Sequence, residues 1–429
     1  MKVSLKSKLG CSLIVISALT AALIAALNFK QQLTTPRDWS FSGALENGGG
    51  PLGLYSAHNN TVAFTPDATH VGYIWIDGSY RNIPKPLTRP KVLTLLEKAE
   101  LRIRSVDDKS PETIVLLDAM DLRPEGSRFT GLTAQVHPSR DSQFIAGLCG
   151  RRLAVVDLET MAHRMIEYEG ELFGSFSWLG GDEVAFSTTN GDSLVFWRAN
   201  INDLPDNRTE VFRQPSLRQD YDREAPDLLY HKWSPKRRYV TLFGYAEAGS
   251  PDNLLLDVEN GTVHRYKFDL DYQCWKPDDS LLLVNDSLYE PRAVYLIDPS
   301  TGEVSDLSDE FRRQFGSDLD VRLVSNQWTP DGAHVLLYTD GGSTAHLRGC
   351  IVDPSPFKLI HSQKGILKRS PFPDWVLVQG GNNFGWLNYK NGSTAPIAGW
   401  VNDWTWSLDG THAARIEEGV IQVFEPELP

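Results

Sequence analysis

The chain has 429 residues, of which 41% are hydrophobic and 12 are tryptophan, enough for a large core. Its formal net charge is −13 at pH 7, which disfavours nucleic acid and anionic lipid headgroups as partners. The four cysteines form no Cys-x-x-Cys pair, which excludes the common zinc and redox motifs.

Residues 1–30 indicate a signal anchor, that is, an uncleaved transmembrane helix. Lys2, Lys6 and Lys8 precede an apolar run, Leu9 to Phe29, that contains no charge. A helix of that length spans roughly 30 Å, the thickness of a bilayer core. Lysines before the run favour an N-terminus in the cytoplasm and a single-pass protein with its main domain outside. The alternative is a cleaved signal peptide with its exit at Thr20-Ala21-Ala22. Residues 31–37 form a short linker, so the domain should lie close to the membrane.

A short phrase, aromatic-x-Pro-Asp in its clearest form, returns along the rest of the chain. It recurs about every 40–50 residues, which is the period of a propeller-type repeat array. The copies are Phe64-Thr65-Pro66-Asp67, Val136-His137-Pro138-Ser139, Trp178-Leu179-Gly180-Gly181, Trp233-Ser234-Pro235-Lys236, Trp275-Lys276-Pro277-Asp278, Trp328-Thr329-Pro330-Asp331, the worn copy Ser370-Pro371-Phe372-Pro373-Asp374, and Trp406-Ser407-Leu408-Asp409.

Each copy of the phrase is typical of a tight turn between two antiparallel strands, because proline presets φ and Asp or Gly suits the following positions. An apolar run such as Tyr239–Phe243 follows, then a second run such as Leu254–Asp257 and a turn. Each unit thus supplies about four strands, one propeller blade. Eight copies predict an all-β propeller of eight blades over residues 38–429; seven remain if the worn copy is only a loop. The aromatic residue of the phrase is expected to pack between blades rather than to stack on a ligand.

This pattern resembles the TolB-like or WD40-like (PD40) propeller repeats. The resemblance is carried best by Trp233-Ser234-Pro235, by Trp328 to Gly332 and by Val294 to Val304, and it covers roughly residues 53–429. It implies a propeller fold and, by analogy, a binding or scaffolding role. The third and seventh copies depart from the family pattern, which leaves the number of blades less certain than the fold.

Closure of the ring is expected to use the start of the chain. Only 21 residues follow Leu408, enough for two strands at roughly Thr411–Glu417 and Val420–Phe424. The segment Asp38 to Gly43 alternates like a strand ahead of the first repeat. We therefore expect this segment to complete the last blade and so to remove its open edge.

Three long spacings between copies locate insertions, and insertions on a rigid ring often carry function. Within the first, Lys91–Lys98 is expected to form a short amphipathic helix. The second, Asn202–Leu228, is the richest in charge, and the third is Ser305–Asp320. In the second, an aromatic side chain among carboxylates suits a basic protein surface, although a solvated loop is the alternative. The candidate partner-binding residues are Asp220, Tyr221, Asp222 and Glu224.

No catalytic residue, cofactor or metal site is predicted. The sequence lacks a Gly-x-Ser-x-Gly elbow, a phosphate-binding Gly-Lys-Ser/Thr loop and a His-Glu-x-x-His motif. His137, His231, His334 and His412 stand near strand starts of different blades, but the last two fall on the second strand, away from the axis.

These features favour a membrane-anchored, extracytoplasmic propeller that binds another protein as a scaffolding subunit of a membrane assembly. The alternative is an enzyme, a hydrolase or lyase acting on sugar or peptide at the channel mouth, with carboxylates gathered from several blades. A small-molecule sensor is the third possibility, and its ligand is left open by the sequence.

Overall fold

The computed structural model describes residues 37–44, 61–85, 88–107, 112–117, 134–189, 193–215, 230–243, 253–270, 273–286, 293–315, 320–340, 348–380, 383–397, 404–407, 409–417 and 420–426. The predicted anchor, residues 1–30, lies outside these ranges, as do residues 31–36 of the predicted linker, whereas Arg37 belongs to the first described strand. No helix within the described ranges combines the length and the apolar character that a bilayer crossing requires. The membrane anchor therefore stays a prediction.

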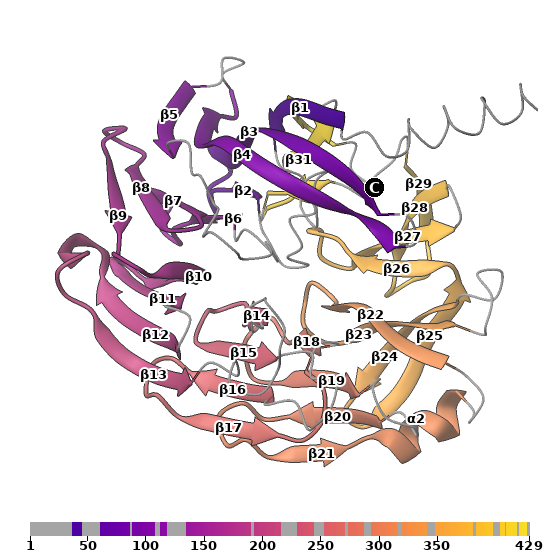
Figure 1. The fold of residues 1–429 in the computed structure, drawn as a ribbon. Helices are drawn as coiled ribbons and strands as arrows, with labels where there is room; N and C mark the ends of the chain where they lie inside the picture. Colours follow the sequence, from indigo (N-terminus) through magenta and orange to yellow (C-terminus); the bar gives the residue numbers. More distant parts are fainter. Residues whose placement is uncertain are drawn as a thin grey trace, which may run out of the picture.

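The described strands form eight sheets that stand around one axis as the blades of a propeller (Figure 1). We number the blades in chain order, and their strands pair antiparallel. Blade 1 contains β1 (Arg37–Ala44), β2 (Val62–Phe64), β3 (His70–Lys85), β4 (Thr88–Ser105) and β5 (Glu112–Leu117). Blade 2 contains β6 (Ala134–Pro138), β7 (Phe144–Cys149), β8 (Arg152–Asp157) and β9 (His163–Glu167).

Blades 3 to 5 follow with four strands each. Blade 3 contains β10 (Leu172–Gly180), β11 (Glu183–Thr189), β12 (Ser193–Asn200) and β13 (Thr209–Pro215), with the 3-10 turn η1 (Ile201–Asp203) between the last two. Blade 4 contains β14 (Tyr230–Trp233), β15 (Tyr239–Phe243), β16 (Asn253–Asp257) and β17 (Val263–Tyr266). Blade 5 contains β18 (Gln273–Trp275), β19 (Leu282–Asp286), β20 (Ala293–Ile297) and β21 (Val304–Asp306).

Blades 6 to 8 complete the ring, after the helix α2 (Ser308–Phe315). Blade 6 contains β22 (Asp320–Trp328), β23 (Val335–Asp340), β24 (Arg348–Pro354) and β25 (Phe357–Lys364). Blade 7 contains β26 (Ile366–Arg369), β27 (Trp375–Gly380), β28 (Asn383–Asn388) and β29 (Thr394–Pro396). Blade 8 contains β30 (Thr405–Trp406), β31 (Ala413–Glu417) and β32 (Val420–Phe424).

The predicted eight blades are confirmed, and the worn copy of the phrase is a genuine turn. It joins β26 to β27, and the Ser370 hydroxyl donates to the carbonyl oxygen of Trp375 across 2.7 Å. The backbone N–H of Phe372 donates to the same hydroxyl across 3.1 Å. The hydroxyl thus holds together a turn whose sequence has lost most of the repeated phrase.

In four blades an Asp of the turn accepts a hydrogen bond from the Ser or Thr hydroxyl two residues earlier. In blade 1 the Thr65 hydroxyl donates to Asp67 Oδ1 across 2.7 Å, and the same oxygen accepts the backbone N–H of Thr69. The residue after Asp67, Ala68, has the left-handed φ of 59° that such turns require. The same hydroxyl-to-carboxylate bond recurs in the pairs Ser139–Asp141, Thr329–Asp331 and Ser407–Asp409.

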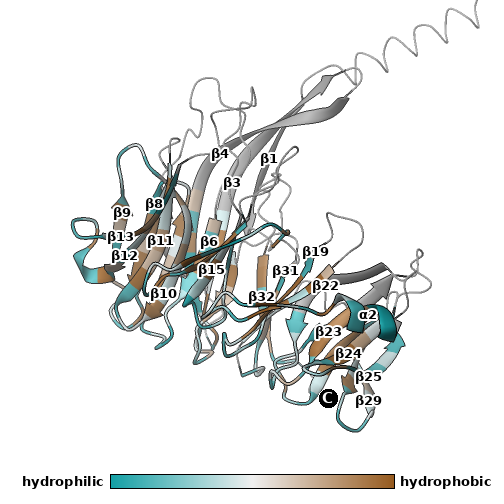
Figure 2. Cartoon of the chain, turned by 90° about the horizontal axis from the view of Figure 1, so that it is seen from below, coloured by the Kyte–Doolittle hydropathy of each residue, from teal (hydrophilic) through white to brown (hydrophobic). Residues whose placement is uncertain are grey.

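The core lies between the blades rather than at the axis. Among the described residues, each neighbouring pair of blades shares one buried apolar cluster. The apolar stretches lie along the strands, while turns and α2 are hydrophilic (Figure 2). The predicted packing of the phrase's tryptophans is confirmed for Trp178 and Trp328, which are 3% and 2% exposed between blades.

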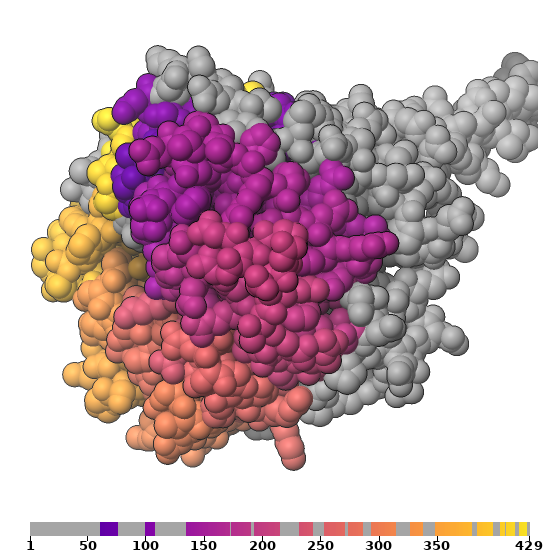
Figure 3. Space-filling model, turned by 90° about the vertical axis from the view of Figure 1, so that its left-hand side faces the viewer, coloured from indigo at the N-terminus to yellow at the C-terminus, as the bar shows by residue number. Residues whose placement is uncertain are grey.

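Side-chain packing between blades 8 and 1 closes the ring. Val62 and Tyr73 of blade 1 form one buried cluster with Ala414 and Ile421 of blade 8. In the space-filling view, indigo and purple residues of blade 1 lie beside yellow residues from the C-terminal part of the chain at the upper left edge (Figure 3). Among the described strands, none is shared between the sheets of blades 8 and 1.

The predicted closing strand forms, but the prediction that it pairs with the last blade is wrong. Residues 37–44 are β1, which pairs with β3 of blade 1, for example Trp39 with Tyr80, and not with blade 8. The cause is the uneven edge of β3. The short β2 covers it only up to Tyr73, and β1 takes up the edge from Trp75 onwards. The unpaired backbone N–H and C=O groups of an open strand edge can pair with any strand that lies beside them.

The predicted helix at Lys91–Lys98 is also wrong, because these residues belong to β4. They continue the antiparallel ladder with β3, from Asp77 paired with Lys98 to Ile83 paired with Lys91. A partner strand that satisfies the backbone overrides the weak helical period of so short a segment. The third insertion does contain a helix, α2, whose Phe311 packs on Phe357 of blade 6 at 4.7 Å between ring centroids.

Candidate functional site

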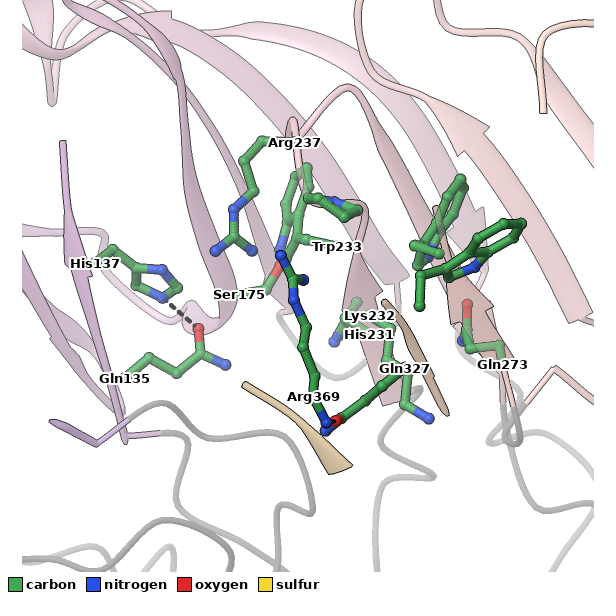
Figure 4. A pocket seen from close by; sticks show the side chains of 13 residues that line it. Gln135, His137, Ser175, His231, Lys232, Trp233, Arg237, Gln273, Gln327 and Arg369 are labelled. Atoms are coloured by element: carbon green, nitrogen blue, oxygen red, sulfur yellow. Dashed lines mark hydrogen bonds between the residues drawn. The ribbon is translucent and has the colours of Figure 1, made fainter. Parts of the chain in front are cut away.

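A pocket of about 500 Å³ opens at the propeller axis, lined by the first strands of blades 2 to 7 and by one connecting turn (Figure 4). Its residues fall into rows set by the repeat. Trp233, Trp275, Trp328 and Arg369 each end the first strand of their blade, directly before the turn. One residue earlier stand His137, Lys232 and Gln327 in their blades, and one earlier again stand His231 and Gln273. Gln135, Ser175, Pro235 and Arg237 complete the lining.

The charge of this pocket is opposite to that of the chain. The protein carries a formal charge of −13, yet the described lining contains Lys232, Arg237 and Arg369 and neither Asp nor Glu. Arg237 and Arg369 come from blades 4 and 7, and their guanidinium groups extend into the same space (Figure 4). Within the described part of the chain, neither guanidinium forms an ion pair. The pocket lining thus presents two guanidinium groups that have no ion-pair partner among the described residues.

Arg237 owes its position to an altered turn. It follows the phrase of blade 4, where Lys236 stands in place of the capping Asp. Its φ is 66°, a left-handed value that costs a residue with a Cβ about 1–2 kcal/mol. The same slot holds glycine in two other turns, Gly332 and Gly410, and a residue with a Cβ and a left-handed φ in three more, Ala68, Ser142 and Asp279. A left-handed φ is therefore general at this slot, and what distinguishes blade 4 is the long cationic side chain that it places there.

Burial lowers the pKa of Arg237, and the nearby Arg140 lowers it further, while Asp279 raises it. The Arg237 side chain is half-buried. An arginine remains protonated throughout the physiological range, so its desolvated charge is available to a bound anion.

Arg369 ends β26 and faces the open side of the pocket. Its backbone N–H donates to the Gln327 side-chain oxygen of blade 6. The residue is exposed by accessible surface, although the protein around it still lowers the pKa of its guanidinium by desolvation. Solvent and ligand can therefore reach this charge.

Two indole groups add neutral donors. The Nε1 atoms of Trp233 and Trp275 are buried and make no hydrogen bond within the described residues. Trp275 stacks on Tyr239 at 5.9 Å between centroids, so one of its faces belongs to the core. Trp328 differs, because its Nε1 donates to the carbonyl oxygen of Cys274 across 3.1 Å. The predicted packing role of the phrase's tryptophans is thus incomplete, since these residues also line the pocket.

His137 is a neutral residue of the pocket wall. Burial, and secondarily the charge of Arg237, lowers its pKa from 6.5 to about 3. Its Nε2 lies 2.8 Å from Gln135 Oε1, an acceptor, so the neutral ring carries its proton on Nε2. This side chain therefore adds shape and polarity but no charge.

The sequence-predicted site and the structural site differ. Asp220, Tyr221, Asp222 and Glu224 lie outside the described residues, and their role in partner binding stays a prediction. The cationic pocket was not predicted. A signal was present, since Lys236 and Arg237 replace the expected Asp-Gly after Ser234-Pro235, but the meeting of Arg237 with Arg369 depends on the ring.

The four histidines considered from the sequence do not meet. His137 and His231 line the pocket, whereas His334 and His412 do not. Over the described ranges, no three side chains of His, Cys, Asp or Glu are grouped in a way that could hold a metal ion.

No protein-family model matches this chain, and neither does any curated protein sequence. The propeller fold implied by the repeats is confirmed, whereas no family model supports membership of the TolB-like or PD40 family.

Solved structures do resemble the chain. A eukaryotic initiation factor is 12% identical over 79% of this chain and 77% of that chain, with a TM-score of 0.48. An oligogalacturonate lyase in complex with manganese is 11% identical over 91% of each chain, with a TM-score of 0.43. The β-propeller domain of the Trilobed protease from Pyrococcus furiosus is 14% identical over 78% of this chain and 93% of that chain, with a TM-score of 0.39. At these identities and TM-scores, no activity is carried over to this chain.

Proposed function

We propose that this propeller is a ligand-binding protein that holds an anionic group in its axial pocket, and that residues 9–29 fix it to a membrane with the ring outside the cytoplasm. The observation that carries the binding role is the pair Arg237 and Arg369, which extend into one space without a carboxylate in the described lining (Figure 4). A half-buried cation such as Arg237 is normally paired, and the exposed Arg369 extends into the same pocket. An unpaired couple on a ring axis is therefore suited to an anion brought from outside.

Physical magnitudes support such a site. Two unit charges about 4 Å apart attract by only ~1 kcal/mol in water, but by ~4 kcal/mol near a protein surface with an effective dielectric constant of ~20. The acidic exterior of the ring repels anions at long range, while the concave cationic pocket concentrates its field at the axis. We therefore expect the pocket to attract anions only at short range, and we expect their affinity to fall as the salt concentration rises.

Binding fits the described pocket better than hydrolysis of a sugar. Most glycoside hydrolases place two carboxylic side chains on either side of the scissile bond. The lining described here offers cations, amides, indoles and a neutral histidine instead. These groups hold and orient an anion, and we accordingly favour a receptor or sensor role over the hydrolase alternative.

The test is isothermal titration of the full-length protein, in detergent micelles, with benzoate, phenyl sulfate, phenyl phosphate and neutral benzamide. We expect saturable binding of at least one anion and none of benzamide. Arg237→Gln and Arg369→Gln should each weaken that anion by about tenfold or more, because a hydrogen bond to a charged group contributes ~1.5–3 kcal/mol.

Arg151→Gln is the matched control, because Arg151 is exposed and lies outside the pocket lining. It removes the same charge from the protein and should leave affinity unchanged. Equal affinity for benzamide and the anions, or no binding of any of the four compounds, would overturn the proposed function.

A further inference from the structure

The pocket is larger than a simple inorganic anion needs. Its volume is about 500 Å³, within the ~300–1,000 Å³ of ordinary small-molecule sites. Three of its lining residues are tryptophans, in one row of the repeat, so part of the wall is apolar and flat. The ligand should accordingly carry an organic body, with a ring that can lie against an indole, in addition to its acidic group.

The number of unpaired cations sets the charge of that group. Arg237 and Arg369 are both permanently protonated, and neither has an ion-pair partner among the described residues. A carboxylate or sulfate ester brings one negative charge and leaves the second guanidinium uncompensated. A phosphate monoester brings up to two at neutral pH, which matches the two guanidinium groups.

We infer that the ligand of this pocket is a phosphate monoester on a flat organic body, bound as a dianion between Arg237 and Arg369. This inference rests on the proposed function, since it names the chemical class of the anion bound at the same site. Guanidinium groups suit it because their planar array of N–H donors matches phosphate oxygens, often in bidentate pairs.

The neutral donors of the pocket differ in whether a ligand can reach them. The indole Nε1–H groups of Trp233 and Trp275 are buried from solvent and have no acceptor within the described residues. They therefore belong to the wall, and a tetrahedral group must take its polar contacts from the accessible side chains of the lining. The Gln327 amide also lines the pocket, with its oxygen already accepting from the Arg369 backbone.

The test compares three aromatic acids of similar size on the native, full-length protein by titration calorimetry. Phenyl phosphate should bind at least about tenfold more tightly at pH 7.5 than phenyl sulfate or benzoate, because the second charge faces a second guanidinium. Inorganic phosphate is titrated as a fourth ligand. It should bind more weakly than phenyl phosphate if the apolar wall takes part, and equal affinity would assign the site to free phosphate.

A pH series gives a second, independent readout. The second proton of a phosphate monoester leaves near pH 6, so the advantage of phenyl phosphate over phenyl sulfate should shrink several-fold between pH 7.5 and pH 5. Other groups around the two guanidinium groups are His137, His231, Lys232, Arg140, Asp279 and Cys274. Protonation of a histidine would strengthen the binding of both ligands at low pH. The ratio of the affinities for phenyl phosphate and phenyl sulfate therefore reports the effect of the ligand's own charge.

The outcomes separate the two proposals. If benzoate and phenyl sulfate bind as tightly as phenyl phosphate at every pH, the pocket is an anion site and the dianion inference is wrong. If no anion binds, the proposed function itself fails. In Arg237→Gln or Arg369→Gln, only one of the two guanidinium groups remains, and the preference for phenyl phosphate should fall to about twofold or less. A preference that survives both substitutions at full size would also overturn the inference.

Discussion

Ser234 donates its hydroxyl hydrogen to Asp279, a residue of the neighbouring blade, across 2.5 Å. In four other turns the equivalent Ser or Thr hydroxyl donates to an Asp two residues later in the same turn, as Thr65 donates to Asp67. Blade 4 has Lys236 at that place, and the backbone N–H of Lys236 also donates to Asp279. The carboxylate missing from one turn is thus supplied by the next blade, next to the turn that presents Arg237.

The first prediction concerns this exchange of partners. Asp279→Ala should lower the free energy of unfolding by about 1–3 kcal/mol, because Ser234 is fully buried and would lose its acceptor. Adding Lys236→Asp should recover most of that loss, since it restores an acceptor within the turn. The measurement is urea unfolding of the full-length protein, followed by tryptophan fluorescence.

Asp331→Ala provides the control, because Asp331 caps Thr329 within its own turn in blade 6. Asp331→Ala should lower the free energy of unfolding by a similar amount, and adding Lys236→Asp should not recover that loss. If the second substitution helps both variants equally, or neither, Asp279 does not replace the capping residue of blade 4.

The second prediction concerns closure of the ring. Ile421 is 5% exposed in the cluster that joins blades 8 and 1, so Ile421→Asp would bury an unpaired charge there. We expect a loss of more than about 2 kcal/mol in thermal or urea unfolding. Val420→Asp, one residue earlier and 55% exposed, should change stability by less than about 0.5 kcal/mol.

Deletion of residues 37–44 completes this comparison. It uncovers an edge of β3 but leaves the cluster between blades 1 and 8 intact, so it should cost less than Ile421→Asp. A larger loss from the deletion than from the buried charge would show that β1, and not side-chain packing, holds the ring closed.

The sequence predicted those parts of the fold that are encoded locally. Each turn phrase, such as Thr329-Pro330-Asp331, contains its own capping hydrogen bond, and counting such phrases predicted eight blades. The partner of β1 could not be predicted in this way. It depends on how far β2 covers the edge of β3, a pairing between residues as distant as Trp39 and Tyr80.

The site was missed for a related reason. Arg237 and Arg369 are far apart in the sequence, and only the ring brings them to one pocket. Arg237 could have been noticed as a departure from the Asp-Gly of the phrase. Arg369 stands where other copies have tryptophan, since Arg369-Ser370-Pro371 aligns with Trp233-Ser234-Pro235, but this local departure does not show which side chain it meets. Convergence at a propeller axis is a property of the closed ring, which a single sequence does not display.

The third prediction uses the pKa of His137, which is lowered from 6.5 to about 3 by burial and by Arg237. Between these two values the unfolded chain binds a proton that the folded chain does not. Stability must therefore fall as pH falls from about 6.5 towards 3, by at most ~1.4 kcal/mol per pH unit from this residue.

His137→Gln should reduce that slope while keeping a donor for Gln135. The measurement is urea unfolding at a series of pH values between 7 and 4. His163→Gln is the control, because His163 is exposed on β9 and should leave the slope unchanged. An identical slope in native protein and His137→Gln would mean that this imidazole is protonated in the fold.

The last prediction concerns the membrane. Lys2, Lys6 and Lys8 precede the uncharged run of residues 9–29, and positive charge next to an apolar helix is retained on the cytoplasmic side. The ring should accordingly lie outside. Protease added to intact spheroplasts of an expression host should digest the ring or its loops while a cytoplasmic marker survives. Protection until lysis would reverse the orientation.

Charge substitution tests the cause as well as the result. Lys30 and Arg37 lie on the other side of the apolar run and oppose the bias weakly. Changing Lys2, Lys6 and Lys8 to Gln leaves these two as the nearest positive charges, so part of the population should invert and become protected from external protease. The matched change of Lys30 and Arg37 to Gln should keep the ring fully accessible. If neither triple nor double substitution alters accessibility, the flanking charges do not set the topology.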